Sequence, residues 1–159
     1  MTVVAWIVEG TWPACVDAVR RYAPADADIV LLHVTDPDVA DAARGAYAGL
    51  LGRRHSHRDP GRQVESLACA AAEQLLDEAA ARLGRRCTRV ERTGRTEREV
   101  VAAADGAELL VLARDGDMSH LGPRSLGHAS RFIVDHAPCR LLLVWPGPPP
   151  AVDTLPPHP

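Results

Sequence analysis

The sequence contains no lysine, and all 18 of its basic residues are arginine. A catalytic lysine that forms a Schiff base and the phosphate-binding lysine of a P-loop are therefore both excluded. Any phosphate site in this chain must use backbone N–H groups, a helix N-terminus or arginine side chains.

Long hydrophobic runs and an excess of positive charge are also missing. No apolar run approaches the roughly 20 residues that a membrane-spanning helix needs, and no basic segment precedes the first hydrophobic stretch. We therefore expect a cytoplasmic protein without a membrane partner. The net charge of −3 does not give the basic footprint of duplex-binding proteins, so no nucleic-acid partner is expected.

Metal-binding patterns are scarce. The four cysteines form no CxxC pair and are expected to be reduced and mostly buried: Cys15, Cys69, Cys87 and Cys139. His55 and His57 lie among arginines without an evident third ligand, which favours a solvated polar loop that at most attracts anions. No metal site is predicted from side chains alone.

Strand-like and helix-like segments alternate along the chain. The first predicted helix shows helical spacing of small apolar residues, and the longest one ends at Gly84, a favourable residue just after a helix. Thr96 followed by Glu99 predicts a capping box at the start of a further helix. The predicted strands cover 2–8, 29–34, 88–92, 109–113 and 140–144, and the predicted helices cover 12–22, 63–83, 96–104 and a segment that begins near 127, with a short helix possible at 39–51.

This alternation predicts one doubly wound α/β domain. The run IVLLHV at 29–34 is apolar on both faces, as in a parallel strand with helices on each side. Residues 1–145 suffice for one domain with a five-stranded parallel sheet, and ligands are expected at the carboxyl ends of its strands. Residues 146–159 are proline-rich and predict a polyproline-like tail that is either disordered or docked on a partner.

Three short segments resemble the universal stress protein family. WIVEGT at 6–11 is similar to the family's strand ending in Asp-Gly-Ser, LHV at 32–34 matches the end of its second strand, and HAPC at 136–139 precedes a similar last strand. The resemblance spans residues 2–145. It implies an adenine nucleotide alpha hydrolase-like sheet of order 3-2-1-4-5, a dimer, and for many members binding of ATP or AMP.

The family's nucleotide signature is Gly, two residues, Gly, nine residues, Gly and Ser or Thr. This chain has Ala113, Gly116, Gly127 and His128 at those positions, with a spacer of ten residues. Arg114 and Arg124 could donate to phosphate, whereas Asp115 and Asp117 add negative charge that Mg²⁺ would balance. The alternative is that the glycines only serve turns and that the arginines are solvated.

The resemblance also implies roles at the ends of the first two strands. Glu9, with Gly10 and Thr11, stands where the family has an Asp that contacts the ligand, and Val34 would meet adenine through its backbone. The alternatives are a solvent-facing turn carboxylate and a core valine. His33 is expected to be structural. No nucleophile, histidine and acid form a recognisable set, so at most weak ATP hydrolysis is expected.

The last strand predicts association. It ends the sheet and forms a hydrophobic edge that must be paired or covered. Leu141, Leu143 and Trp145 alternate on one face, and in the resembling family this edge forms the homodimer. The alternative is an edge covered by the tail. The sequence thus predicts a regulatory or stress-response dimer that binds an adenine nucleotide, or else a scaffold of the same fold that has lost the nucleotide.

Overall fold

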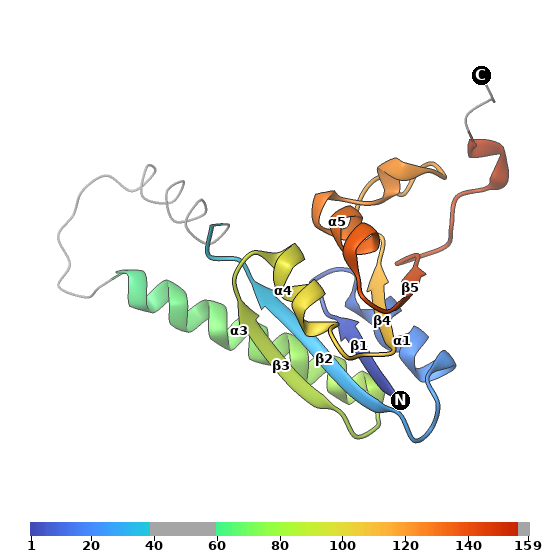
Figure 1. Ribbon diagram of the computed structural model, residues 1–159. Coiled ribbons are helices and arrows are strands. Elements are labelled where there is room, and N and C mark those ends of the chain that lie inside the picture. Colours follow the sequence, from blue (N-terminus) through green and yellow to red (C-terminus); the bar gives the residue numbers. More distant parts are fainter. Residues whose placement is uncertain (39–59, 156–159) are drawn as a thin grey trace, which may run out of the picture.

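The computed structural model describes residues 1–38 and 60–155, with the side chains of the long helix described from Ser66 onward. Five parallel strands form one sheet in the order β3-β2-β1-β4-β5 (Figure 1). The strands are β1 (Thr2–Trp6), β2 (Asp28–Thr35), β3 (Thr88–Thr93), β4 (Leu109–Ala113) and β5 (Arg140–Val144). The helices are α1 (Trp12–Tyr22), α3 (Pro60–Leu83), α4 (Thr96–Ala103) and α5 (His128–His136), with 3-10 turns η1 (Pro123–Ser125) and η2 (Val152–Thr154). The predicted fold class is confirmed.

Helices cover both faces of the sheet. Val3, Ala5 and Ile7 of the first strand and its extension pack against α1 and α3, whereas Val4 and Trp6 pack on the opposite side against α4 and α5. This alternation is the direct result of the two-residue period of a strand. It explains why the central strands are apolar at nearly every position.

Most predicted elements lie where the sequence placed them, and their ends differ by a few residues. α3 ends at Leu83, and Gly84 follows it with a φ of 64° while its N–H donates to Ala80 O at 3.1 Å, as predicted. The expected helix at 39–51, together with His55 and His57, lies outside the described residues. Among those described, no helix has the length and apolarity needed to cross a membrane.

The capping box predicted at Thr96 is wrong. The cap residue of α4 is Arg95, with no side-chain cap hydrogen bond, so Thr96 already occupies the first helical position. Gly94 turns the chain just before it, with a φ of 153°, and the Glu99 carboxylate accepts from Arg92 Nη1 at 3.4 Å. The Glu99 side chain lies against Gly94 and contacts Arg92 of β3, but it makes no side-chain cap hydrogen bond to α4.

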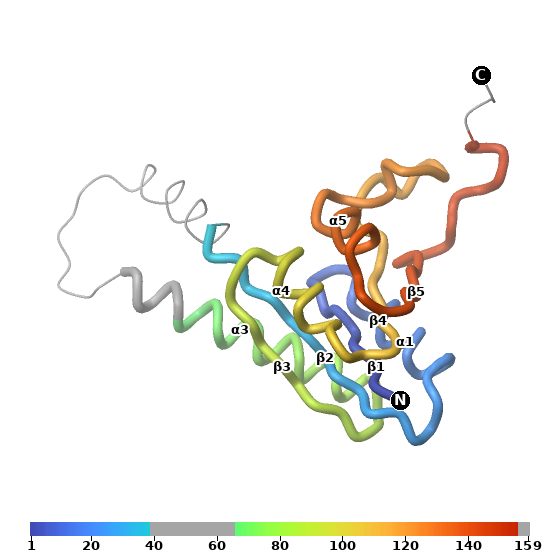
Figure 2. The backbone as a smooth tube through the Cα atoms, viewed as in Figure 1, coloured from blue at the N-terminus to red at the C-terminus, as the bar shows by residue number. Residues whose placement is uncertain are grey.

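The chain leaves the sheet in opposite directions after β1 and β4. β1 is followed by α1 on one face and leads to β2, whereas β4 is followed by α5 on the other face and leads to β5. Such a reversal opens a crevice outside the carboxyl ends of the central strands, where doubly wound folds bind ligands. Figure 2 shows the same path as a tube, from β1 in the middle of the sheet to the tail that leaves β5.

Candidate functional site

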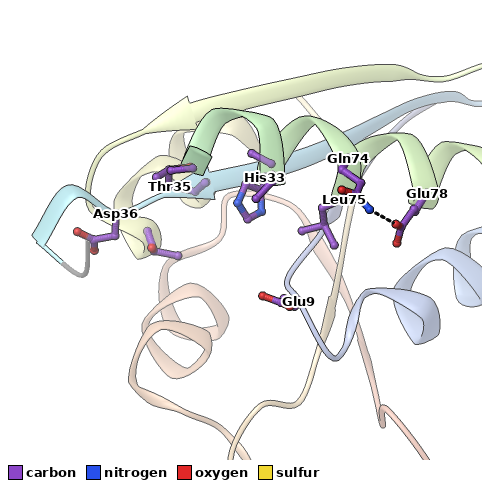
Figure 3. A pocket seen from close by; sticks show the side chains of 12 residues that line it. Glu9, His33, Thr35, Asp36, Gln74, Leu75 and Glu78 are labelled. Carbon is purple, nitrogen blue, oxygen red and sulfur yellow. Dashed lines mark hydrogen bonds between the residues drawn. The ribbon is translucent and has the colours of Figure 1, made fainter. Parts of the chain in front are cut away.

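A cavity of about 610 Å³ lies at the carboxyl ends of β1 and β2, beside α3. Figure 3 shows Glu9 reaching toward it from the loop after β1, while His33, Thr35 and Asp36 come from the end of β2 and Gln74, Leu75 and Glu78 from α3. Five further residues with small or medium-sized side chains complete the lining: Val34, Ala68, Ala71, Ala72 and Thr96. Three alanines of one helix create the space, because larger side chains there would fill it.

The end of the β1–β2 ladder exposes backbone groups of β2 to this cavity. The last paired residue of β1 is Trp6, opposite Leu32, and Ile7 N–H still donates to Leu32 O at 2.7 Å. The next acceptor, Ile7 O, lies 2.9 Å from His33 Nδ1, which must carry the proton since a carbonyl only accepts. Alternate residues of a strand turn their peptide groups to the same side, so Val34 directs its N–H and C=O toward the place that β1 has left.

The charges around the cavity are negative. Its lining contains three carboxylates, Glu9, Asp36 and Glu78, and within the described ranges no arginine contributes to it. Glu78 accepts from Gln74 Nε2 at 2.9 Å, and both residues line the α3 side of the cavity. A lining of this kind suits a neutral polar ligand and disfavours a polyanion.

The glycine loop between β4 and α5 is closed by its own hydrogen bonds. Gly116 N–H donates to Ser125 O at 3.0 Å, and Asp117 N–H donates to Arg124 O at 2.8 Å. A Cβ on Gly116 would lie 2.3 Å from Arg124 O, so this glycine is required by the returning part of the loop itself. The first loop amides that a phosphate would use are therefore already engaged.

The start of α5 holds an internal carboxylate. Gly127 is the cap residue of α5, and its N–H donates to Asp115 Oδ1 at 2.7 Å. A Cβ on Gly127 would lie 2.9 Å from Asp115 Oδ2. A negatively charged group at this point also interacts favourably with the helix dipole.

Arg114 is turned toward β5 instead of the cavity. Its guanidinium carbon lies 4.5 Å from the centre of the Trp145 ring, and its Nη1 donates to the buried Ser125 hydroxyl. Its Nε is buried without a partner among the described residues. A fixed cation–π contact of this kind leaves Arg114 a structural role in the loop.

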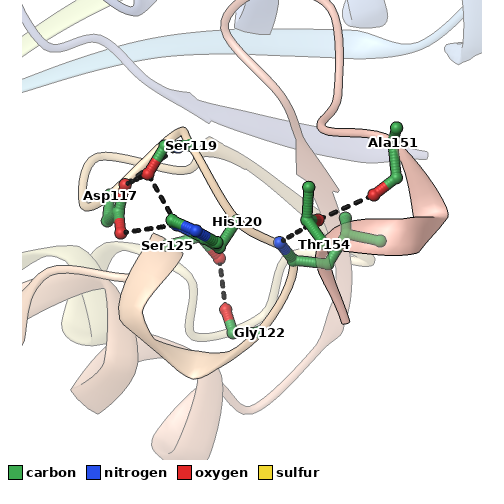
Figure 4. A network of polar contacts seen from close by, with 8 residues as sticks. Asp117, Ser119, His120, Gly122, Ser125, Ala151 and Thr154 are labelled. Carbon is green, nitrogen blue, oxygen red and sulfur yellow. Dashed lines mark hydrogen bonds and ion pairs between the residues drawn. The ribbon is translucent and has the colours of Figure 1, made fainter. Parts of the chain in front are cut away.

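The outer part of the loop carries a polar network (Figure 4). Asp117 Oδ1 accepts from Ser119 N–H at 2.8 Å and from the Ser119 hydroxyl, and these bonds, with a smaller effect of His120, hold the pKa of Asp117 below its usual value. The described part of the tail, 146–155, contacts the same loop, since Leu121 N–H donates to Thr154 Oγ1 at 3.0 Å. The first ten residues of the proline-rich tail thus include η2 and a contact with the domain.

The structure separates the predicted site residues into two groups. Glu9 and Val34 line the cavity. Among the described residues, five predicted loop positions are not part of its lining: Ala113, Arg114, Gly116, Gly127 and His128. Gly10 has a φ of 83° and shapes the turn before α1, and Thr11 caps that helix without a side-chain cap bond. Their roles in nucleotide binding stay predictions.

Sequence reasoning missed the wall that α3 contributes. Ala68, Ala71 and Leu75 recur at helical spacing, which on its own also describes an ordinary buried helix face. It also missed the contact of Asp115 with Gly127. A carboxylate two residues after a strand gives no signal of where its side chain will turn.

Comparison with known proteins agrees with this fold and with the early resemblance. A sequence model of the universal stress protein family matches residues 9–144. The chain belongs to the universal stress protein family. No curated protein matches the sequence.

Several solved structures share the fold of this universal stress protein. A universal stress protein in complex with cAMP has a TM-score of 0.59 at 19% identity, over 92% of this chain and 98% of that one. Universal stress protein UspA from Lactobacillus plantarum has a TM-score of 0.56 at 17% identity, over 91% and 97%. The hypothetical protein PH0823 has a TM-score of 0.62 at 15% identity, over 91% and 95%. At these identities the likeness establishes the fold alone.

Proposed function

We propose that this universal stress protein binds an adenine nucleoside or nucleotide, with the base and ribose in the cavity between the ends of β1 and β2 and α3. The observation that carries the proposal is that Glu9, from the loop after β1, and Val34, from β2, line the same cavity, and the family resemblance places both at the ligand. A solved relative of the same fold is a universal stress protein in complex with cAMP. A regulatory role through the bound ligand would follow.

The chemistry of the cavity matches the two parts of adenosine. Adenine offers a donor and an acceptor side by side on its pairing edge, which complement the C=O and N–H of Val34. Glu9, exposed at the rim, is placed to accept from the ribose hydroxyl groups. The apolar walls formed by alanines and Leu75 suit the faces of the base.

Calorimetry with adenosine, AMP and ATP tests this function. We expect heat of binding with the wild type and a loss of affinity of at least about tenfold in Ala71→Trp, because the indole would fill the cavity from an exposed position on α3. Ala70→Trp is the matched control, since Ala70 is also exposed on the same helix and is not among the residues that line the cavity. Absence of binding at millimolar adenosine would reject the proposal.

We also propose that the protein is a homodimer that pairs through β5. Support comes from the sheet order, in which β5 has β4 as its one neighbour in the described part of the chain, and from the partial exposure of Leu141, Leu143 and Trp145. Leu141 and Leu143 also pack against the core on the α4–α5 side, so their side chains serve the domain as well as an edge contact. The cytoplasmic location stays a prediction.

A second candidate function is a scaffold of the same fold that binds no nucleotide. The closed hydrogen bonds of the glycine loop favour it, because they use amides that a phosphate would need. The two candidates differ in the calorimetric result with adenosine, which only the first expects to bind. Release of a nucleotide from the freshly purified protein would also contradict the scaffold.

A further inference from the structure

We propose that Asp115 occupies the anion position at the start of α5 and thereby makes the site selective for adenine ligands without a polyphosphate. The inference rests on the proposed function, and it adds the class of ligand and the residue that determines it. ATP would have to displace a carboxylate of this chain, whereas adenosine would not.

The contact of Asp115 is specific to one donor. Its Oδ1 lies 2.7 Å from Gly127 N, at the cap of a nine-residue helix, and both carboxylate oxygens lie close to Gly127 Cα, where a Cβ would be 2.9 Å and 3.0 Å from them. A hydrogen bond to a charged acceptor is worth more than a neutral one, and the positive end of the helix dipole adds to it. The carboxylate therefore stands where the third glycine of the nucleotide signature would meet phosphate.

Several other donors of the loop that could bind a polyphosphate are already engaged within the protein. The N–H groups of Gly116 and Asp117 donate to carbonyl groups of residues 124 and 125, and the Arg114 guanidinium is held over the Trp145 ring. The two N–H groups would have to break an internal hydrogen bond before they could bind a ligand, and Arg114 would have to leave the Trp145 ring. The exchange would also free the carbonyl group of Ser125, a residue that is fully buried, and an unpaired buried acceptor is costly.

The negative charge of the cavity also disfavours a polyphosphate, independently of the loop. Glu9, Asp36 and Glu78 face it, and in the described ranges its lining holds no cation. The phosphate groups of a nucleotide whose base lies in this cavity would therefore meet negative charge on both sides, from the lining and from Asp115. An uncharged nucleoside avoids both repulsions.

Calorimetry on Asp115→Ala and Asp115→Asn, with adenosine and ATP in the presence and absence of Mg²⁺, tests the inference. In the wild type we expect adenosine to bind more tightly than ATP. In Asp115→Ala the affinity for ATP should rise by about tenfold or more, while the affinity for adenosine stays unchanged. Asp115→Asn, which keeps an acceptor and loses the charge, should give a smaller gain. Thermal melts followed by circular dichroism show whether each variant is folded.

Asp117→Ala is the matched control, because it removes an equal charge from the same loop but from a side chain that bonds to Ser119 and His120. An equal rise in ATP affinity in this variant would assign the effect to net charge and overturn the role of Asp115. Tighter binding of ATP than adenosine by the wild type, with or without Mg²⁺, would also overturn it, as would an unchanged ratio in Asp115→Ala. Failure of the wild type to bind adenosine would instead refute the proposed function on which the inference rests.

Discussion

Gly116 and Gly127 are the two glycines of the nucleotide signature that this chain retains. Different neighbours limit the space for a Cβ atom at the two positions. A Cβ on Gly116 would overlap a backbone oxygen of the returning loop at 2.3 Å, whereas a Cβ on Gly127 would meet the end of the Asp115 side chain at 2.9 Å. Backbone cannot move aside as a side chain can. We therefore expect Gly116→Ala to lower the free energy of unfolding by about 1–3 kcal/mol and Gly127→Ala to lower it less.

Urea denaturation of the two glycine variants measures this difference. Asp115→Ala combined with Gly127→Ala provides a control, because the added methyl group then has no carboxylate to displace and the two changes should not be additive. A Gly116→Ala protein as stable as the wild type would show that the loop is looser than these contacts indicate.

Cys15 is the most deeply buried of the four thiols, and desolvation raises its pKa to about 12, against a smaller lowering effect of a backbone bond with Ala113. The unfolded chain releases this proton near pH 9.0, whereas the folded chain keeps it to about 12. Its contribution to stability is thus present below pH 9.0 and declines as the pH rises above that value.

Alkylation with iodoacetamide near pH 9.0, followed by peptide mass spectrometry, checks this assignment. We expect the exposed Cys69 to react first and Cys15 to react only as fast as the protein unfolds. Labelling of both cysteines at one rate in the native protein would contradict the burial of Cys15.

At the scale of elements, the order of strands and helices could be predicted because each apolar run has a length and period typical of its class. The exact end of β1 could not, since the prediction ran to Val8 whereas the ladder stops at Trp6, where the ring of His33 takes the carbonyl of Ile7. That contact joins residues 26 positions apart in the sequence. It depends on the packing of β2 beside β1, which local pattern does not contain.

The candidate site shows the same division. Glu9 and Val34 could be predicted because Glu9 follows the first strand, Val34 lies near the end of the second, and both match a family motif. The role of Ala71 in the cavity and the direction of the Asp115 side chain could not be predicted. Both depend on contacts between elements that are distant in the sequence. The sequence therefore identified the two strand ends that line the cavity. The contribution of α3 and the contact of the Asp115 carboxylate with Gly127 became visible only in the structure.

At the scale of the whole molecule, the open edge of β5 decides whether the protein is a dimer. Val144 O accepts from Arg114 N–H at 2.9 Å, so its peptide groups face β4, and by alternation those of Leu143 face outward. Leu143→Pro would remove the outward N–H without breaking a bond to β4, whereas Leu143→Ala would remove the side chain and keep that N–H.

We expect sedimentation equilibrium to find a dimer for the wild type and for Leu143→Ala, and a monomer for Leu143→Pro. The comparison separates backbone pairing from side-chain packing, because both variants lose the leucine side chain that packs toward α5. A chain that ends at residue 145 distinguishes the remaining possibility, an edge covered by the tail, since uncovering the edge would then increase association. A wild type that is monomeric at all concentrations, with a truncated chain that dimerises, would show that the tail blocks the edge and that pairing through β5 is not the native state.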